Sequence, residues 1–393
     1  MAEFAPVPRA ALDIVTGSRG PENIRSERVK IEMADKISSY MPDAAPLTTF
    51  TSRLRDKRTV ENYRFDWLES DEYPRELELT ANSAIADLTL SVTAGDEARV
   101  AANYVLMNQR TGEQVLVGST SSGVVTVTRD IGGQGEADMV AGDVLVFTRP
   151  VYEDGADVGT SKSTKDVAKF NYTEIIRTPF SFTRRDAKTA LFAGKDPMTE
   201  RKKQAIEHKK SIEHAFFFGQ RNAITGTHIR SFTGGLNYWI QSNQWDVTGV
   251  QVTERAFDEV LEEAMRWGSG GNQKGNGLKY LFASSRWITE LNWFAKGKVE
   301  YRPLDETIGF GCMEYLSPHG RVRIIKTPIL DYNNQGDAYL LDLNHIRYVA
   351  FDDTVLEKDR GGNGVDGSTE EYISDVGLQV ELEAAHTRFK GLS

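Results

Sequence analysis

Hydrophobic and polar residues follow helical spacing in some parts of the chain and strand-like alternation in others. Near the end of the chain, Leu378, Val380 and Leu382 alternate with polar residues, as in a half-buried strand. The order of the expected elements is too irregular for repeated βαβ units, so the pattern predicts the α+β class. In the second half of the chain the spacing predicts helices over Glu254–Trp267 and Ser285–Phe294, and strands at Lys279–Ala283, Val322–Lys326 and Ala338–Leu341.

A long charged segment, Thr199–Arg221, has the composition of a helix and no internal proline. At ~1.5 Å per residue it would form a rod of about 34 Å. Its apolar face is thin and holds Ala205, His208, Ile212, Ala215, Phe216 and Gly219. The other faces hold Glu200, Lys202, Lys203, Glu207, Lys209, Lys210 and Glu213. Because a core helix normally has an apolar arc of at least ~100°, we expect Ile212 and Phe216 to anchor this helix, with its charged residues facing outward.

Short β-type runs separated by Gly, Asn and Asp fill residues 81–150 and predict a small separate β module. The tripeptide Ala-Gly-Asp occurs twice in it, at Ala94–Asp96 and Ala141–Asp143. The module is interpreted as a structural insertion, and a ligand-binding role is the alternative. A strand interrupted at Pro179 is expected over residues 170–184. Residues 1–60 read as an extended arm or a disordered terminus, with one helical segment near Ser26–Tyr40.

Composition excludes several classes of protein. The chain has 393 residues, 47 Lys and Arg against 57 Asp and Glu, and a formal net charge of −10, so it has no broad basic surface for nucleic acid. One cysteine, Cys312, excludes a disulfide framework within the chain and a cysteine-rich zinc site. The first residues do not resemble a signal peptide, and no apolar run approaches the ~20 residues of a membrane span. We therefore expect a soluble protein made in a reducing cytoplasm.

No motif in the sequence predicts a catalytic, cofactor-binding or metal-binding residue. Gly362–Gly367 matches GxGxxG but lies in a charged loop rather than between a strand and a helix. The glycine-rich loop Gly268–Gly277 lacks P-loop spacing, and His208 and His214 are about 120° apart on a helix, too far around to share a metal ion. The glycosylation sequence at Asn171 has no secretory context. A hydrolase whose catalytic carboxylates lie on distant segments and form no sequence motif is one alternative, but we expect no enzyme and no cofactor.

A basic cluster in the first 60 residues could contact phosphate. Asp56 and Glu61 dilute it, so a solvated arm or a salt-bridged subunit contact is the favoured interpretation. The cluster consists of Arg53, Arg55, Lys57 and Arg58.

Five segments in order resemble the major capsid proteins of tailed bacteriophages, which have the Hong Kong 97 fold, and in more detail the branch with a β insertion in the extended loop. Pro42–Tyr73 resembles the arm and the entry to that loop, and Asn171–Ala187 resembles the returning limb. Thr199–Arg221 lies where the family has its long spine helix. Thr233–Ile240 resembles the step into the axial domain, and Gly377–Leu392 resembles the closing strand.

The resemblance implies a set of domains. The expected bounds are an N-terminal arm at 1–60, an extended loop at 61–80 and 156–184 carrying an inserted β domain at 81–155, a peripheral domain at 185–224 and 346–393, and an axial domain at 225–345. The family's type member links neighbours by isopeptide bonds between a loop lysine and an asparagine. Here no lysine occurs from Arg58 through Ser161, which leaves Lys162, Lys165 and Lys169 as candidates.

The function implied by the resemblance is that of a structural head protein. It would assemble in the host cytoplasm into hexamers and pentamers of an icosahedral virion shell. Its expected partners are a separate scaffold protein, a portal and a decoration protein, with only weak, non-specific contact to packaged DNA and none to membrane. The alternatives are an encapsulin-like compartment and a virion module that binds glycans or the host surface. The inserted strands hold few aromatic residues, Tyr104 among them, which argues against a sugar-stacking platform.

Overall fold

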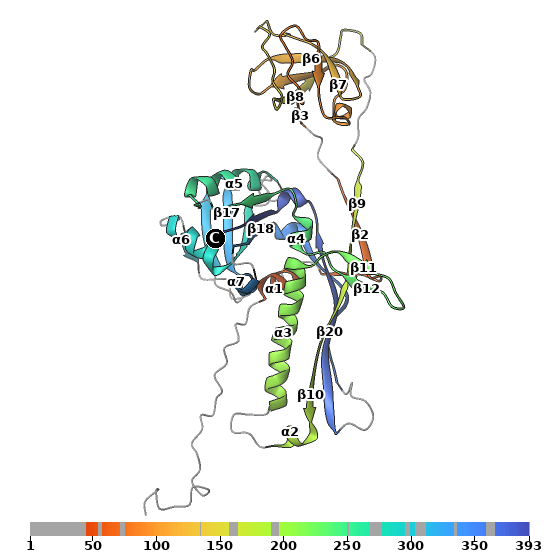
Figure 1. The fold of residues 1–393 in the computed structure, drawn as a ribbon, viewed down its shortest axis with the longest axis vertical. Coiled ribbons are helices and arrows are strands. Elements are labelled where there is room, and N and C mark those ends of the chain that lie inside the picture. The colour runs from red at the N-terminus through yellow and green to blue at the C-terminus, as the bar shows by residue number, and fades with distance from the viewer. Residues whose placement is uncertain are drawn as a thin grey trace, which may run out of the picture. The chain divides into compact units, whose positions relative to one another are not determined.

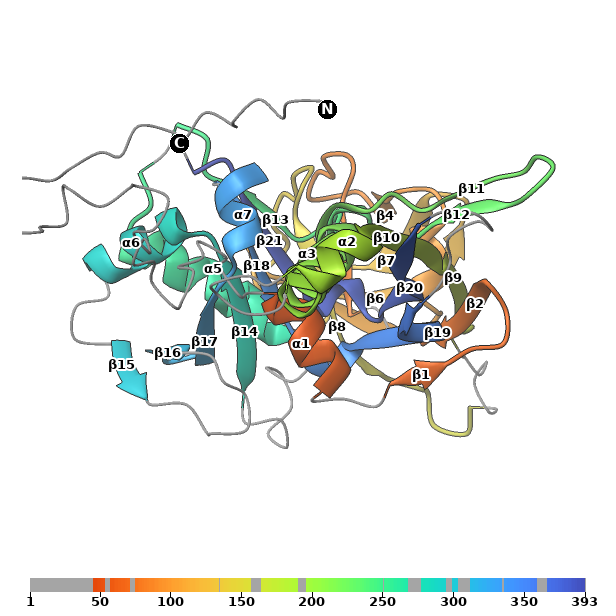
Figure 2. The ribbon, with the colours of Figure 1, turned by 90° about the horizontal axis from the view of Figure 1, so that it is seen from below.

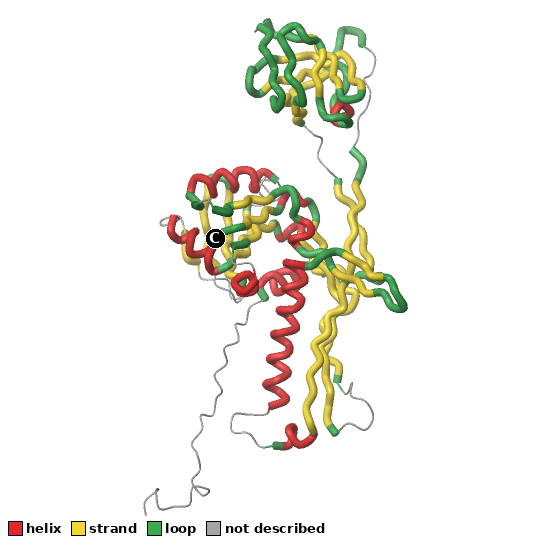
Figure 3. The backbone as a smooth tube through the Cα atoms, viewed as in Figure 1, coloured by secondary structure: helices red, strands yellow, loops and turns green. Residues whose placement is uncertain are grey.

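The chain forms two compact units, each described here by itself (Figures 1 and 3). One unit consists of residues 1–65 and 171–393, and the other of residues 66–170. The computed structural model describes residues 45–53, 57–70, 75–133, 135–156, 164–189, 196–249, 251–267, 277–294, 299–302, 312–333, 336–358 and 366–392. The expected helix at Ser26–Tyr40 and the loops at 268–276 and 359–365 lie outside these residues.

The first unit is built around a long helix, α3 (Asp196–Phe218), which runs beside two long strands (Figure 1). It begins earlier than expected because Pro197 is tolerated in the first turn, where its missing N–H has no intrahelical partner to lose. It ends before Gly219, where a Cβ atom would lie 2.4 Å from the Thr233 carbonyl oxygen. The chain can therefore leave the helix closely packed against the segment that follows.

Both expected anchors of α3 are buried: Ile212 is 1% exposed and Phe216 is fully buried. The Phe216 ring meets Tyr348 at 5.7 Å. Phe217, which the thin apolar face does not include, is also buried and meets Tyr339 at 5.2 Å. The helix therefore packs along two faces near its C-terminal end, which is one face more than the sequence pattern predicts.

The long strands belong to a four-stranded sheet with the order β1–β19–β20–β10. Strand β10 passes through Pro179 without interruption, so the break expected there is wrong. As an edge strand it tolerates a residue without an N–H, because half of its donors point away from the sheet. The expected alternation through Leu382 is also wrong, because β20 ends at Val380 and Leu382 turns with a φ of 52°. The strands are β1 (Arg58–Thr59), β19 (Ile346–Glu357), β20 (Gly367–Val380) and β10 (Glu174–Thr183).

A seven-stranded sheet forms the other part of the first unit (Figure 2). Its core joins the sheet to α5 (Glu254–Arg266) and α6 (Ser285–Phe294) through Phe257, Trp287 and Phe389. The expected helices and strands of this region are confirmed to within a few residues. In spatial order the strands are β13 (Gln244–Asp246), β21 (Thr387–Lys390), β18 (Ala338–Leu341), β14 (Leu278–Ala283), β17 (Gly320–Lys326), β16 (Cys312–Ser317) and β15 (Val299–Arg302).

Short elements complete the first unit. Residues expected to form an extended arm instead form helix α1 (Pro46–Arg53). The helix is stabilised because the side chains of Leu47 and Phe50 are buried. The Phe50 ring meets Tyr280 at 5.7 Å and Phe282 at 6.1 Å. The remaining elements are α2 (Arg184–Lys188), the hairpin of β11 (Asn222–Ile224) and β12 (Arg230–Phe232), α4 (Leu236–Trp239) and α7 (Pro328–Asn333).

The second unit is a six-stranded antiparallel sheet with the order β3–β8–β5–β6–β7–β4 and a core of Leu, Val and Met side chains. Both Ala-Gly-Asp tripeptides form turns, with left-handed glycines at Gly95 (φ 101°) and Gly142 (φ 88°). The strands are β3 (Glu76–Glu78), β8 (Val144–Pro150), β5 (Tyr104–Asn108), β6 (Gln114–Ser121), β7 (Val124–Thr128) and β4 (Thr89–Ser91).

A buried ion pair fixes the loops of this unit. Arg129 Nε donates to Glu113 Oε1 at 2.9 Å and Arg129 Nη2 donates to Glu113 Oε2 at 2.7 Å, with both side chains buried. Arg129 also donates to the Ala84 carbonyl oxygen at 2.6 Å. Close to where the chain enters and leaves the sheet, the Phe147 N–H donates to the Arg75 carbonyl oxygen at 2.8 Å. The chain leads in and out through a two-stranded pair, β2 (Arg64–Glu69) with β9 (Val167–Tyr172).

Because the chain enters and leaves the six-stranded sheet at adjacent points, we expect that the sheet can be deleted without unfolding the first unit. Replacing residues 76–146 by a short Gly/Ser linker should shift the thermal midpoint of the remaining chain by less than about 4 °C, the equivalent of ~1 kcal/mol. Circular dichroism and size-exclusion chromatography measure this. Phe216→Ala provides the positive control, because its cavity should cost ~3–5 kcal/mol. An insoluble or non-cooperative deletion variant would show that the first unit needs the sheet.

Candidate functional site

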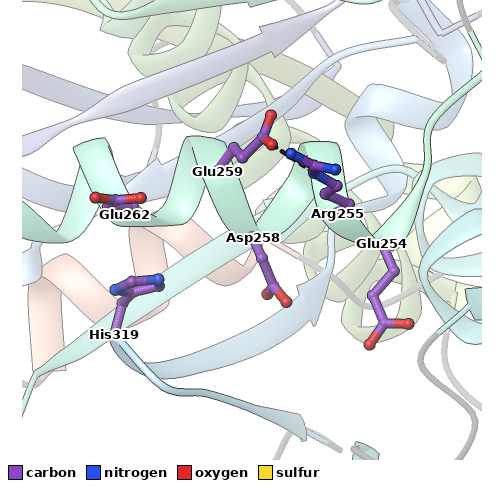
Figure 4. Close-up of a pocket in the computed structure, with 6 residues that line it drawn as sticks. All are labelled: Glu254, Arg255, Asp258, Glu259, Glu262 and His319. Atoms are coloured by element: carbon purple, nitrogen blue, oxygen red, sulfur yellow. Dashed lines mark hydrogen bonds and ion pairs between the residues drawn. The ribbon is translucent and has the colours of Figure 1, made fainter.

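The described residues hold no group of three or more His, Cys, Asp or Glu side chains able to bind a metal ion. An open hollow lies over the outer side of α5 (Figure 4). Its arginine is already paired, since Arg255 Nε donates to Glu259 Oε1 at 2.9 Å. Below it, the Tyr315 hydroxyl donates to Asp258 at 2.9 Å, and burial raises the pKa of Tyr315 so that it stays protonated. The lining residues are Glu254, Arg255, Asp258, Glu259, Glu262 and His319.

This hollow does not have the groups of a hydrolytic site. It contains carboxylates, one arginine and one histidine, but no serine, cysteine, threonine or lysine that could act as a nucleophile. It also has no pair of buried, mutually close acids, because Glu259 and Glu262 are exposed and Glu254 and Asp258 are only half-buried. It is an acidic surface of the molecule.

The histidines named from the sequence have structural positions. His208 is fully buried, with Nδ1 2.9 Å from Thr178 Oγ1 and Nε2 2.7 Å from Ser374 Oγ. Burial lowers the pKa of His208, so the neutral ring joins α3 to β10 and β20. His214 is exposed on another side of the helix. The two side chains are not brought together.

Asn171, the residue of the glycosylation sequence, is fully buried. Its side-chain amide donates to the carbonyl oxygens of Leu378 at 2.7 Å and Gly234 at 3.0 Å, and its side-chain oxygen accepts from the Gly234 N–H at 2.8 Å. One side chain thus ties together three segments that are far apart in sequence. Burial also excludes it as a glycan acceptor in the folded chain.

Residues of the basic cluster are engaged within the chain. Arg58 Nη1 donates to Gln379 Oε1 at 2.7 Å, and Lys57 forms an ion pair with Asp353. Arg55 and the GxGxxG segment through Val365 lie outside the described residues. On the returning limb, Lys169 Nζ lies 2.9 Å from Glu69 Oε2, Lys165 is exposed, and Lys162 lies outside the described residues.

The most unusual polar group is Glu213, which the sequence pattern places on a charged outer face of α3. That expectation is wrong, because Glu213 is fully buried and its carboxylate accepts three hydrogen bonds from α1. The donors are the Leu47 N–H at 2.9 Å, the Thr48 N–H at 2.7 Å and the Thr48 hydroxyl at 2.6 Å. These N–H groups belong to the first turn of α1, where no intrahelical acceptor exists and an anion is favoured. Figure 2 shows α1 beside α3.

Burial raises the pKa of Glu213 to about 7, although the donors from Thr48 and Leu47 oppose the shift. A second buried polar cluster lies under the seven-stranded sheet. There Lys279 Nζ donates to the Ala385 carbonyl oxygen at 2.7 Å, and burial lowers the pKa of Lys279 to about 8 and that of His386 to about 3. Both clusters hold segments together, and neither lines the hollow over α5.

Comparison with known proteins decides the family. The profile of the family described as SU10 major capsid protein matches residues 16–393. The chain belongs to the SU10 major capsid protein family.

Relatives of this capsid family agree with that assignment. The chain is 28% identical over 300 residues to the major capsid protein of Pseudomonas phage PaMx41, covering 73% of this chain and 70% of that protein. Among solved structures, it resembles the capsid of cyanophage A-1(L), with a TM-score of 0.52, 10% identity and coverage of 93% of this chain and 98% of that one. It also resembles the capsid of an empty GTA particle, with a TM-score of 0.50, 10% identity and coverage of 95% and 98%.

The chain is therefore a phage major capsid protein with the Hong Kong 97-type fold, as the five ordered segments predict. This function is favoured over an encapsulin-like compartment. None of the helices in the described ranges is both long and apolar enough to cross a membrane. The sequence pattern does not predict that Glu213 is buried. A helix predicted over Pro46–Arg53, whose first N–H groups lack an intrahelical acceptor, is the signal that could have indicated a buried carboxylate.

The raised pKa of Glu213 predicts a pH-dependent stability. Its pKa rises from an ordinary 4.5 to about 7 on folding, so its favourable contribution is complete below pH 4.5 and is lost as the pH rises through 7. The unassembled subunit should lose roughly 3 kcal/mol from this group between pH 4.5 and 8. Guanidinium unfolding followed by tryptophan fluorescence at pH 5 and pH 8 measures the loss.

Glu213→Gln should remove this dependence and also lower stability at pH 5, because its amide nitrogen would face the Thr48 N–H. Glu207→Gln, an exposed carboxylate on the same helix, is the matched control and should keep the wild-type dependence. Equal pH profiles for wild type and Glu213→Gln would contradict the assignment.

Proposed function

We propose that this chain is the repeating subunit of an icosahedral phage head, assembled as hexamers and pentamers around double-stranded DNA, and that it has no enzymatic activity. The observation that carries the proposal is the family match over residues 16–393. Three buried polar groups that are hydrogen-bonded within the chain support a structural role. His208, Asn171 and Glu213 each bind segments of the same chain.

The domains of the capsid fold are assigned here as proposals. The arm is 1–60, the extended loop is 61–80 and 156–184, the inserted β domain is 81–155, the peripheral domain is 185–224 and 346–393, and the axial domain is 225–345. Helix α3 and most of the four-stranded sheet would then form the peripheral domain. Four strands pair with a sheet outside the domain that their residue numbers give them. Strands β1 and β10 pair with the strands of the peripheral range, β3 pairs with the inserted β domain, and β21 joins the sheet assigned to the axial domain.

The net charge of the subunit indicates how it would contact DNA. With a net charge of −10 the subunit would hold DNA weakly, since strong binding requires many Lys and Arg contacts to phosphate. A separate scaffold protein, a portal and a decoration protein are the remaining proposed partners, and assembly would take place in the host cytoplasm. Weak DNA contact keeps the packaged molecule free to leave.

Electron microscopy of the purified chain tests the proposed function. Under assembly conditions, with scaffold protein added where needed, negative stain should show closed shells with pentameric and hexameric capsomers. A folded chain that stays monomeric in every condition, with and without scaffold, would contradict the proposal.

The lysine distribution predicts a shell without covalent links between subunits. No lysine occurs between Arg58 and Ser161, and arginine cannot replace it because its guanidinium stays protonated. Lys169 is already paired with Glu69 at 2.9 Å. Mature particles boiled in detergent should therefore run as a single band near 43.9 kDa. A ladder of covalent pentamers and hexamers would overturn this, and Lys162→Arg and Lys165→Arg would then identify the donor.

A further inference from the structure

The hairpin of β11 and β12 extends outward from the first unit (Figures 1 and 2). In the described structure its two strands form a sheet of their own, with Ala223 opposite Ser231 and Ile224 opposite Arg230. Every residue from Ile224 through Arg230 is exposed. A two-stranded hairpin is marginally stable at best in water, so this one needs support from outside its own strands.

The root of the hairpin receives that support from the first unit. The Ser231 hydroxyl donates to the carbonyl oxygen of Thr173, which lies between β9 and β10, at 2.6 Å. The Arg221 guanidinium lies 4.9 Å from the ring centre of Tyr238. These contacts fix the direction of the hairpin but do not cover its outer end.

Two isoleucines are exposed at the outer end. Ile224 is 52% exposed and Ile229 is 51% exposed, although isoleucine is among the residues most often buried. Ile224 and Arg230 project from the same side of the hairpin because they stand directly opposite each other. Ser231, the next residue, projects from the reverse side, where it binds Thr173. The exposed end, named here the hairpin tip, consists of Ile224, Ile229 and Arg230.

The hairpin has no acidic residue in a chain that is acidic overall. No Asp or Glu occurs from His214 to Trp245, whereas the chain has 57 of them and a net charge of −10. Glu174 is hydrogen-bonded at the root rather than at the tip, since its carboxylate accepts from the Thr233 N–H at 3.2 Å. The tip therefore presents a positive charge beside apolar side chains, which complements an acidic surface with an apolar part.

The chemistry of the tip favours a protein partner over nucleic acid. Strong binding to DNA requires many Lys and Arg contacts to phosphate, and the tip has a single arginine beside two apolar side chains. The chain itself supplies the complementary charge, because exposed acids such as Glu262 and Glu263 on α5 outnumber its basic residues overall. A second subunit is thus a partner of matching chemistry that is present wherever the protein is.

We propose that the hairpin tip of one subunit docks on an acidic, partly apolar surface of a second copy of this chain. The inference rests on the proposed function and identifies an element that joins subunits. Two tips repel each other because both are positive and neither has an acid. The contact therefore joins different surfaces of identical subunits, and it closes into a ring when the rotation between neighbours fits. The fixed root lowers the ordering cost of docking.

Substitutions in the tip test the docking. Ile224→Glu and Arg230→Glu should each raise the critical concentration for assembly about tenfold or more, because each places a negative charge against an acidic surface. Arg230→Lys keeps the charge and should stay within about threefold of wild type. Arg286→Glu, an exposed arginine on α6, is the control with the same charge change and should assemble like wild type. Light scattering and negative-stain microscopy give the readout.

Thermal unfolding of the unassembled variants separates folding from assembly. Because the substituted side chains are exposed, the midpoints of both glutamate variants should stay within about 2 °C of wild type. Folded glutamate variants that assemble like wild type would overturn the docking while leaving the capsid function standing. A folded wild-type chain that forms no rings or shells would instead remove the proposed function, and the inference with it.

A photo-crosslinking residue in place of Thr227, which is exposed at the turn of the hairpin, identifies what covers the tip. Irradiated particles should yield a covalent product at twice the monomer mass, and mass spectrometry should locate the second attachment point on another copy of the chain, near exposed acids. Products linked only to DNA or to a different protein, or no product in particles that assemble normally, would overturn the inference.

Discussion

The first unit depends on one buried carboxylate. Glu213 reaches from α3 to the first turn of α1, and α1 in turn inserts Phe50 between Tyr280 and Phe282 of the seven-stranded sheet. A charged or polar group in that position must be fully hydrogen-bonded, because an unsatisfied buried carboxylate costs several kcal/mol. The three donors from Leu47 and Thr48 meet that requirement only in one placement of α1. The interaction therefore specifies where the chain enters the unit and how the long helix, the sheet and the arm join.

The other polar groups inside this unit have the same role. His208 bridges β10 and β20, Asn171 joins three distant segments, and Lys279 donates to carbonyl oxygens at the ends of two helical segments. In an enzyme, such perturbed groups would line a cavity and have one free position for a substrate. Here each is occupied by its own chain. Buried titratable residues in a shell protein thus act as connectors between layers that the hydrophobic core alone would leave free to slide.

Local patterns in the sequence predict the regular elements well and the connections poorly. Helix Ser285–Phe294 and strand Ala338–Leu341 are confirmed at their predicted bounds because their apolar spacing is set by one nearby core. Glu213, Pro179 and Leu382 mislead for a common reason: the partner of each lies far away in sequence. The residues around Glu213 do not show that another helix donates hydrogen bonds to it. In the same way, the sequence around Pro179 and Leu382 does not show that one lies on a sheet edge and the other between two sheets. The family resemblance succeeds because it depends on the order of five segments, which survives such local errors.

The chain enters and leaves the six-stranded sheet of the second unit close to one hydrogen bond, from the Phe147 N–H to the Arg75 carbonyl oxygen. Any domain whose two termini lie a few ångströms apart could be connected to the chain at the same two points. The position is therefore one where another inserted domain could replace this one by exchange at its two junctions. Phages that share a shell can in this way diverge in the module they carry, while the buried connectors that hold the subunit together stay under separate selection.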